Sequence, residues 1–258
     1  MKKALRVLVT NDDGVDAPGL EILVEAARKL APDAEVWVVA PLLEQSGASQ
    51  SLTMINPVRI HPFGEGRFAV SGTPADFVII ALQQIMKDCP PDVVLSGVNA
   101  GVNIGFDVNL SGTLGGAFTG LMYGVPSIAI SMKRGEHKDV RWETAQTLLP
   151  TLLSGLLEKG WDKGHCLSVN IPDLPFDKIV GVRWTHPSHG LTPPFATKPG
   201  KDLREREYFW IYPKHHPKTD AAPESDAAAL QQGFVSISVL ALTRRFVLPN
   251  LTPPKIKE

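Results

Sequence analysis

The stretch LRVLVTNDDG at residues 5–14 decides the fold that we expect of this chain. Its first six residues are rich in valine and leucine, which is typical of a buried strand, and the Asp-Gly step that follows indicates a turn. Asp12 and Asp13 therefore stand at the end of a buried strand, where two carboxylates repel each other and lose hydration. Such a pair favours a hard divalent cation with oxygen ligands. The alternative is an Asx turn, in which one aspartate caps a helix that begins near Pro18.

Strand-like runs and helical patterns alternate along most of the chain. The predicted strands are residues 5–10, 35–40, 92–96, 127–131 and 166–170, and the predicted helices are residues 19–30, 74–86, 113–123 and 142–159. Alternation of this kind predicts parallel strands joined by crossover helices, and therefore an α/β fold.

Length and composition narrow the class of protein. With 258 residues, of which 43% are hydrophobic, the chain is long enough for one substantial domain. A net charge of −1 argues against a nucleic-acid polymer as the main partner. Cys89 and Cys166 lie far apart, so we expect reduced cysteines and a cytoplasmic protein. No apolar run reaches the ~18 residues of a membrane span and no cleavable signal pattern occurs, so we expect no membrane partner.

The composition changes after about residue 172. Residues 193–226 are rich in proline, lysine and aspartate, and the aromatic run at residues 208–212 predicts one strand of a hairpin that projects from the core. Exposed aromatic side chains on such an arm usually pack on a partner surface. Residues 233–240 alternate as a further strand does. We expect a single domain over residues 1–258, with a core at about 1–190 and 230–245, a projecting arm at about 191–229 and a C-terminal tail at about 246–258.

Polar residues follow each of the first three predicted strands. NDDG at residues 11–14 follows the first, EQSG at residues 44–47 lies after the second, and SGVNAGVN at residues 96–103 ends the third. Because the carboxyl ends of the strands in a doubly wound sheet form one edge, we expect these loops to meet. They offer carboxylates, hydroxyls and carboxamides but no histidine or cysteine, which favours Mg²⁺ or Mn²⁺ over Zn²⁺. Taken singly, Ser46 also suits a helix cap and Asn99 a turn.

A fourth polar segment, NLSGTLGG at residues 109–116, precedes an apolar helical run. Serine, glycine and threonine at a helix start leave backbone N–H groups and hydroxyls available, which makes an anion site. The alternative is ordinary N-capping by Ser111. A metal site and an anion site at one sheet edge together favour phosphoryl chemistry. The chain has no P-loop, no Gly-x-Ser-x-Gly elbow and no His-Glu-x-x-His motif.

Five segments, in this order, resemble the SurE survival-protein family of metal-dependent 5′/3′-nucleotidases. They are VTNDDG at residues 9–14 with APG at 17–19, EQSG at 44–47, SGTPAD at 71–76, SGVN at 96–99 with Gly101 and Asn103, and SGT at 111–113. The resemblance covers residues 5–131, and residues 233–240 weakly. It implies a Rossmann-like three-layer core with a mostly parallel sheet, and a C-terminal hairpin or arm that is used in oligomerisation to a homodimer or homotetramer.

The resemblance also implies a reaction and a set of site residues. The reaction is hydrolysis of nucleoside 5′-monophosphates, and also 3′-monophosphates, to nucleoside and phosphate, with one divalent ion, Mg²⁺ or Mn²⁺, per subunit. The implied metal ligands are Asp12, Asp13, Ser46 and Asn99. We expect Asp12 and Asp13 to be catalytic, with Asp12 orienting or deprotonating the attacking water, and an aspartyl-phosphate on Asp12 is the alternative. The expected phosphate- and substrate-binding residues are Asn11, Gly47, Asn103, Ser111, Gly112 and Thr113.

Other readings of the chain stay open. Leu42 and Leu43 stand where the family usually has an Asp-Arg pair, which bears on substrate preference. The alternative function is a non-catalytic phosphate- or nucleotide-sensing module that uses the same site. Candidates for the leaving-group acid are His186, His189, His215 and His216, each of which is otherwise a surface histidine.

Overall fold

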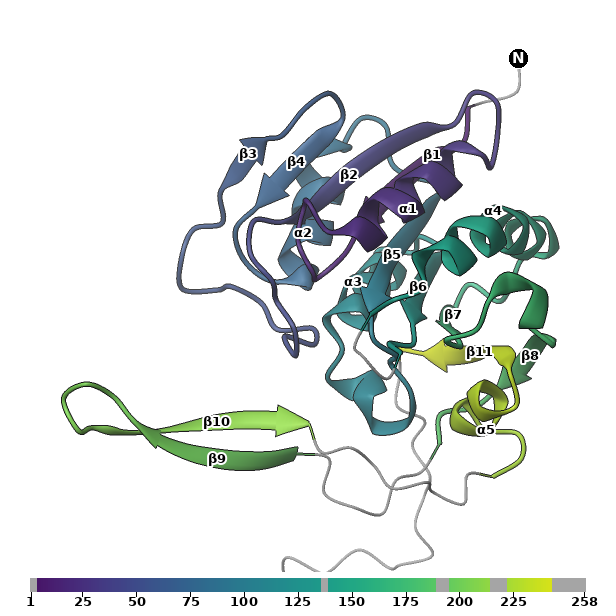
Figure 1. Cartoon of the computed structure of the whole chain (residues 1–258). Helices are drawn as coiled ribbons and strands as arrows, with labels where there is room; N and C mark the ends of the chain where they lie inside the picture. Colours follow the sequence, from purple (N-terminus) through teal and green to yellow (C-terminus); the bar gives the residue numbers. More distant parts are fainter. Residues whose placement is uncertain (1–3, 136–138, 189–194, 214–221, 243–258) are drawn as a thin grey trace, which may run out of the picture.

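A mixed β-sheet forms the centre of the molecule. In the computed structural model, which describes residues 4–135, 139–188, 195–213 and 222–242, nine strands lie in the order β3-β4-β2-β1-β5-β6-β7-β11-β8 (Figure 1). They are β1 (Arg6–Thr10), β2 (Glu35–Pro41), β3 (Ile60–Pro62), β4 (Arg67–Val70), β5 (Val93–Ala100), β6 (Ser127–Met132), β7 (His165–Ile171), β8 (Gly181–Thr185) and β11 (Phe234–Ala241).

Six neighbouring strands, from β4 through β7, run parallel to one another. At one edge β3 is antiparallel to β4, and at the other edge β11 is antiparallel to β7 and parallel to β8. The α/β fold with a mostly parallel sheet is thereby confirmed, and the carboxyl ends of the parallel strands share one edge.

Helices cover both faces of the sheet. Along β1, Val7 and Val9 pack in one cluster with residues of α1 (Pro18–Arg28) and α4 (Trp142–Lys159). Leu8, which lies between them, packs on the other face with α2 (Pro74–Ile80). The helix α3 (Gly112–Met122) covers that same face beside β6. The alternation of valine and leucine along β1 therefore produces the expected three layers.

Two predicted boundaries were wrong. The helix predicted at residues 74–86 ends as an α-helix at Ile80 and continues as a π-helix, η1 (Ala81–Ile85). The strand predicted to end at Ser96 continues as β5 to Ala100, with a register shift against β6 between Ser96 and Asn99. Gly97 makes this bulge possible, because its φ is +137° and an added Cβ would lie 2.2 Å from the carbonyl oxygen of Ile130.

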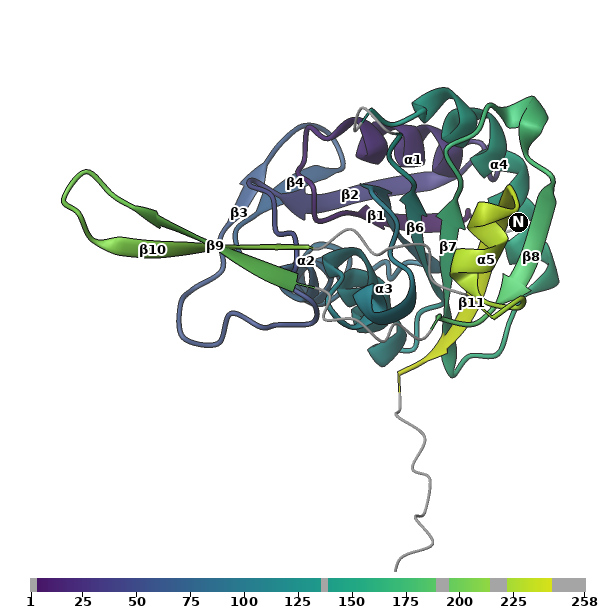
Figure 2. The same ribbon diagram turned by 60° about the horizontal axis from the view of Figure 1, so that its bottom comes forward.

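The predicted hairpin is present. The strands β9 (Phe195–Lys201) and β10 (Glu207–Pro213) pair only with each other and extend away from the main sheet in both views (Figures 1 and 2). Phe209, Trp210 and Ile211 are 62%, 66% and 72% exposed. Further along the chain, the short helix α5 (Asp226–Gln231) packs on β11.

The division of the chain into core, arm and tail stays a prediction, and the predicted tail lies outside the described residues. Two short 3-10 helices complete the described elements, η2 (Gly105–Asn109) and η3 (Phe176–Lys178). None of the helices in the described ranges combines the length and apolar character that crossing a membrane requires.

Candidate active site

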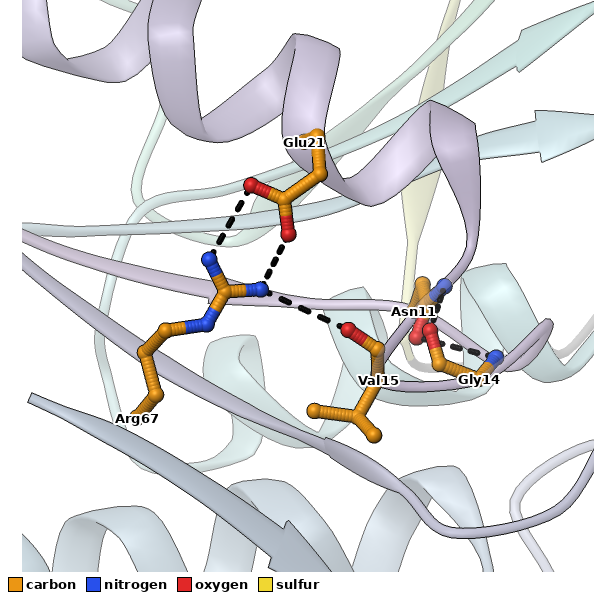
Figure 3. Close-up of polar contacts among 5 residues, drawn as sticks. All are labelled: Asn11, Gly14, Val15, Glu21 and Arg67. Carbon is orange, nitrogen blue, oxygen red and sulfur yellow. Dashed lines mark hydrogen bonds and ion pairs between the residues drawn. The ribbon is translucent and has the colours of Figure 1, made fainter. Parts of the chain in front are cut away.

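The turn after β1 is held in shape from two sides (Figure 3). Within the turn, the Asn11 side-chain amide donates to the carbonyl oxygen of Gly14 at 2.9 Å and its oxygen accepts the Gly14 N–H at 3.4 Å. From β4, Arg67 donates to the carbonyl oxygen of Val15 at 3.4 Å and forms an ion pair with Glu21 of α1. These contacts fix the backbone that presents the two aspartates between Asn11 and Gly14, and they engage the side chain of Asn11.

Asp12 is buried, with 4% of its surface exposed, and it faces the N-terminus of α3. The Thr113 hydroxyl donates to Asp12 Oδ1 at 2.7 Å. Gly112 leaves room for the other carboxylate oxygen, since an added Cβ would lie 2.6 Å from Asp12 Oδ2. Burial raises the pKa of Asp12 to about 6; the Thr113 hydroxyl acts in the opposite direction, and the charge of Asp13 adds to the rise. Asp12 is therefore a carboxyl group that titrates near neutral pH.

Asp13 lies beside the end of β5. Its Oδ2 accepts the backbone N–H of Ala100 at 3.2 Å. Burial is the main cause that raises the pKa of Asp13 above its ordinary value. The Ala100 hydrogen bond and the charge of Arg134 lower this pKa, whereas the charge of Glu44 raises it.

Neither aspartate caps the following helix. The N-cap of α1 is Ala17, which makes no side-chain capping hydrogen bond, and Pro18 is the first residue of the helix. The Asx-turn alternative for this helix start is therefore wrong. One buried and one partly buried carboxylate therefore lie side by side here without a capping role that would explain them.

The loop after β2 reaches the aspartate turn through its backbone. The Gln45 N–H donates to the carbonyl oxygen of Asp12 at 2.8 Å, which places the neighbouring Ser46 next to the turn. The Ser46 hydroxyl donates to Glu44 Oε1 at 2.6 Å and caps no helix. Gly47 adopts a φ of +76°, and nothing within 4 Å would meet an added Cβ there. The Ser46 oxygen thus lies in an exposed loop that is tied to the buried turn.

Hydrogen bonds from β6 and β7 hold the loop after β5 in place. The Asn99 side-chain amide donates to the carbonyl oxygen of Gly101 at 2.8 Å, as expected of a turn residue, and its side-chain oxygen remains an acceptor. The Asn103 side-chain amide donates to Ser131 Oγ at 2.8 Å. Asn170 of β7 accepts the Asn103 N–H at 2.8 Å and donates to the Asn103 carbonyl oxygen at 3.1 Å. The backbone N–H, the backbone carbonyl and the side-chain NH2 of Asn103 therefore all bond to buried polar side chains of the sheet.

The fourth segment joins the others at the N-terminus of α3. Ser111 is the N-cap, and its hydroxyl oxygen accepts the Leu114 N–H at 3.1 Å, so the capping alternative for this serine is confirmed. The Ser49 N–H donates to the carbonyl oxygen of Leu110 at 3.1 Å, which joins the loop after β2 to this segment. Gly115 permits that approach, because an added Cβ would lie 2.0 Å from the Ser49 carbonyl oxygen. All four polar segments thus meet at one edge of the sheet.

Two further charged residues lie near this edge, of which Arg134 is marked by no sequence pattern. Arg134 donates from Nε to the carbonyl oxygen of Ala100 at 2.5 Å. Asp226, which is 1% exposed, accepts the N–H groups of Gly105 at 2.8 Å and Ser188 at 2.9 Å. Asp226 therefore links α5 to the start of η2, the segment that leads into the N-terminus of α3.

The histidine candidates do not meet this edge as far as the structure describes them. His186 contacts the Pro187 carbonyl oxygen through Nδ1 at 3.2 Å, and its Nε2 lies 3.8 Å from the Glu224 carboxylate. His189, His215 and His216 lie outside the described residues. A leaving-group acid therefore stays unassigned.

The donor chemistry of the edge fits a hard cation. Within the described ranges, no group of three or more histidine, cysteine, aspartate or glutamate side chains is placed to hold a metal ion. A cation bound here would need hydroxyl or amide oxygens besides the carboxylates of Asp12 and Asp13. Ser46 and Asn99 carry such oxygens, and their neighbours Gln45 and Ala100 hydrogen-bond to the two aspartates.

Comparison with known proteins identifies the family. Residues 7–192 match the family described as "Survival protein SurE". The chain belongs to the SurE family. It is 44% identical over 239 residues to 5′-nucleotidase SurE 1 of Burkholderia lata, a match that covers 93% of this chain and 91% of the relative. It is 41% identical over 238 residues to 5′-nucleotidase SurE of Azorhizobium caulinodans, covering 92% of each.

A solved SurE structure has the same fold. The crystal structure of the SurE protein from Aquifex aeolicus superposes with a TM-score of 0.76 at 32% sequence identity, covering 92% of this chain and 94% of that one. The resemblance inferred from the five sequence segments is therefore confirmed, and it extends over more of the chain than those segments do.

Proposed function

We propose that this SurE-family protein is a divalent-metal-dependent phosphomonoesterase that hydrolyses nucleoside 5′-monophosphates, and also 3′-monophosphates, to nucleoside and phosphate. The observation that carries the proposal is the adjacent pair of the buried Asp12 and the partly buried Asp13, on which four polar segments converge. The names of the relatives, which are 5′-nucleotidases, support the same class of reaction.

One Mg²⁺ or Mn²⁺ per subunit would be held by Asp12, Asp13, Ser46 and Asn99. The donors are all oxygen atoms, which these ions prefer. A cation would also offset the burial and repulsion that raise the pKa values of both aspartates. When bound, such an ion lowers the pKa of a coordinated water and neutralises developing charge on a phosphoryl group.

Asp12 is the proposed general base. In the metal-free protein burial raises its pKa to about 6, and a bound cation would lower this pKa, so Asp12 is ionised at neutral pH and can orient the attacking water and accept its proton. The Thr113 hydroxyl fixes Oδ1, and Oδ2 lies against Gly112, which leaves room for it. The competing route is an aspartyl-phosphate on Asp12, and ¹⁸O from solvent would then enter the carboxyl group instead of going directly into phosphate during a single turnover.

The phosphate would be held at the N-terminus of α3. Gly112 supplies a backbone N–H at the positive end of the helix dipole, and the Ser111 hydroxyl, whose oxygen accepts the Leu114 N–H, keeps its own proton to donate. Thr113 contributes through the Asp12 carboxylate that it hydrogen-bonds, and the backbone at Gly47 lies in the adjacent loop. We assign Asn11 and Asn103 to shaping the loops, since both side-chain amides already have partners.

The projecting hairpin is the proposed contact between subunits of a homodimer or homotetramer. Its support is the exposure of Phe209, Trp210 and Ile211 on β10. Light scattering after size-exclusion chromatography tests it, because the Trp210→Ser variant should dissociate to smaller species. A variant with the mass of the wild type would count against this role of the hairpin.

Phosphate release from a panel of nucleoside 5′- and 3′-monophosphates tests the function. The reactions contain Mg²⁺, Mn²⁺ or EDTA, and wild type is compared with Asp12→Asn, Asp13→Asn and the matched control Asp16→Asn, an exposed aspartate of the same turn. We expect turnover that needs metal, is lost in the first two variants and persists in the control. Metal-dependent binding of phosphate or nucleotide without turnover would instead support the sensing module.

A further inference from the structure

We propose that Arg134 binds the phosphoryl dianion of the substrate and of the phosphate product. This inference rests on the proposed function and adds to it a cationic residue that binds the negatively charged phosphoryl group. Arg134 follows the end of β6 at Met132, and β6 lies beside β5 at the edge where the aspartates meet (Figure 1).

Ala100 connects Arg134 to the aspartate pair. Its N–H donates to Asp13 Oδ2 at 3.2 Å, and its carbonyl oxygen accepts from Arg134 Nε at 2.5 Å. The next residue, Gly101, lies under the guanidinium, because an added Cβ would come within 3.9 Å of Arg134 Nε. The carboxylate of Asp13 and the guanidinium of Arg134 therefore flank one residue of β5, and the positive charge lowers the pKa of Asp13.

The backbone on either side of Arg134 is anchored. The backbone of Arg134 forms a β-bridge with Val140, and the Gly135 N–H donates to the carbonyl oxygen of Asp139 at 2.8 Å. In the part of the chain that the structure describes, no carboxylate pairs with Arg134 and no hydrogen bond uses its two Nη atoms. Three other arginines differ, since Arg6, Arg67 and Arg141 each pair with a carboxylate.

An arginine held through Nε directs its two Nη atoms as a planar fork, which matches two oxygens of a phosphoryl group. A positive charge is needed at this site, because the groups around it are negatively charged. Asp12, Asp13 and Glu44 are all acidic, and a phosphate monoester carries about −1.5 to −2 at pH 7. The loop after β2 supplies no cation, since residues 42–47 read LLEQSG. Arg134 therefore offers the positive charge on the protein side of an otherwise acidic site.

The test compares Arg134→Met, which removes the charge, with Arg134→Lys, which keeps the charge but loses the fork. Lys133→Met is the matched control, because it removes an exposed cation one residue away. Two quantities are measured: KM and kcat for a nucleoside 5′-monophosphate, and the Kd of inorganic phosphate by calorimetry in the presence of Mn²⁺. Loss of one charge-assisted contact predicts an about tenfold rise in KM and in the Kd of phosphate for Arg134→Met.

We expect kcat to change little in Arg134→Met, because the contact is made equally to the bound substrate and to the transition state. We expect Arg134→Lys to lie between wild type and Arg134→Met. Lys133→Met should match wild type. Equal Kd values for phosphate in wild type and Arg134→Met would overturn the inference, as would an equal loss in Lys133→Met.

Failure of the proposed function is separable from failure of this inference. A wild type that binds phosphate but hydrolyses no nucleotide refutes the enzyme, while the Kd comparison still decides the role of Arg134. A wild type that neither hydrolyses nucleotide nor binds phosphate refutes both.

Discussion

Replacing Asp12 by asparagine should stabilise the metal-free protein near neutral pH while it abolishes turnover. Burial raises the pKa of Asp12 from 3.8 to about 6, so ionising this group in the folded protein is unfavourable. A difference of that size corresponds to about 3 kcal/mol of folding free energy. Asparagine keeps the shape of the side chain and an oxygen to accept the Thr113 hydroxyl, yet it carries no charge.

The sign of the pH dependence follows from the direction of the pKa change. Below pH 3.8, Asp12 is protonated in both the folded and the unfolded chain, so its charge has no effect on stability. Between pH 3.8 and about 6 the folded protein binds the proton more tightly, so the free energy of unfolding falls as pH rises. Above pH 6 the full destabilisation is present. The gain from Asp12→Asn should therefore be about 3 kcal/mol at pH 7.5 and about 1 kcal/mol at pH 4.5.

Urea unfolding in EDTA, at one fixed protein concentration, measures these gains. Asp16→Asn is the control, because an exposed aspartate in the same turn should change the free energy of unfolding by less than about 0.5 kcal/mol. An Asp12→Asn protein no more stable than wild type at pH 7.5 would refute the reasoning. A gain of the same size at both pH values would refute it as well.

Two further substitutions test the space beside Asp12 and the ion pair that holds the turn after β1. Gly112→Ala places a methyl group 2.6 Å from Asp12 Oδ2, so kcat/KM should fall at least about tenfold. Gly155→Ala is the control, because nothing lies within 4 Å of its added Cβ. This control should leave kcat/KM unchanged and stabilise its helix by about 0.5 kcal/mol. Arg67→Met removes the partner that lowers the pKa of Glu21, and because both groups are partly exposed the loss should be about 1 kcal/mol or less. That loss of stability should be present at pH 7 and vanish as pH falls through the lowered pKa of Glu21. A difference in urea midpoint between wild type and Arg67→Met that is equal at pH 7 and at acid pH would contradict the ion pair as its cause.

The sequence predicts the layered core well, because the strands next to its centre are buried on both faces. The runs that became β1, β2, β6 and β7 are mostly apolar and largely buried, and the long helix at Trp142–Lys159 has the predicted bounds. The sequence did not predict the short outer strands β3 and β4 or the edge strand β8. Their residues are partly exposed, so they lack the apolar runs that mark a strand.

The site was predictable as a meeting of loops but not atom by atom. Topology alone brings the ends of parallel strands together, which is why Asp12 and Asp13 could be expected beside the other segments. Whether a given amide is available depends on residues far away in sequence: Asn103 is engaged by Ser131 and Asn170. Arg134 is one of two adjacent exposed cations after a strand, and such residues carry no pattern that would mark them.

The place of β11 in the sheet bears on the order in which the chain can fold. Although β11 comes last among the strands, it lies between β7 and β8 and hydrogen-bonds to both. A nascent chain that has already emerged through β8 therefore exposes β7 as an open strand edge, and edges of this kind pair readily with other chains. β8 can join the sheet only after the arm and α5 have been synthesised and β11 has docked, so chains interrupted before Phe234 should aggregate instead of forming a smaller version of the fold.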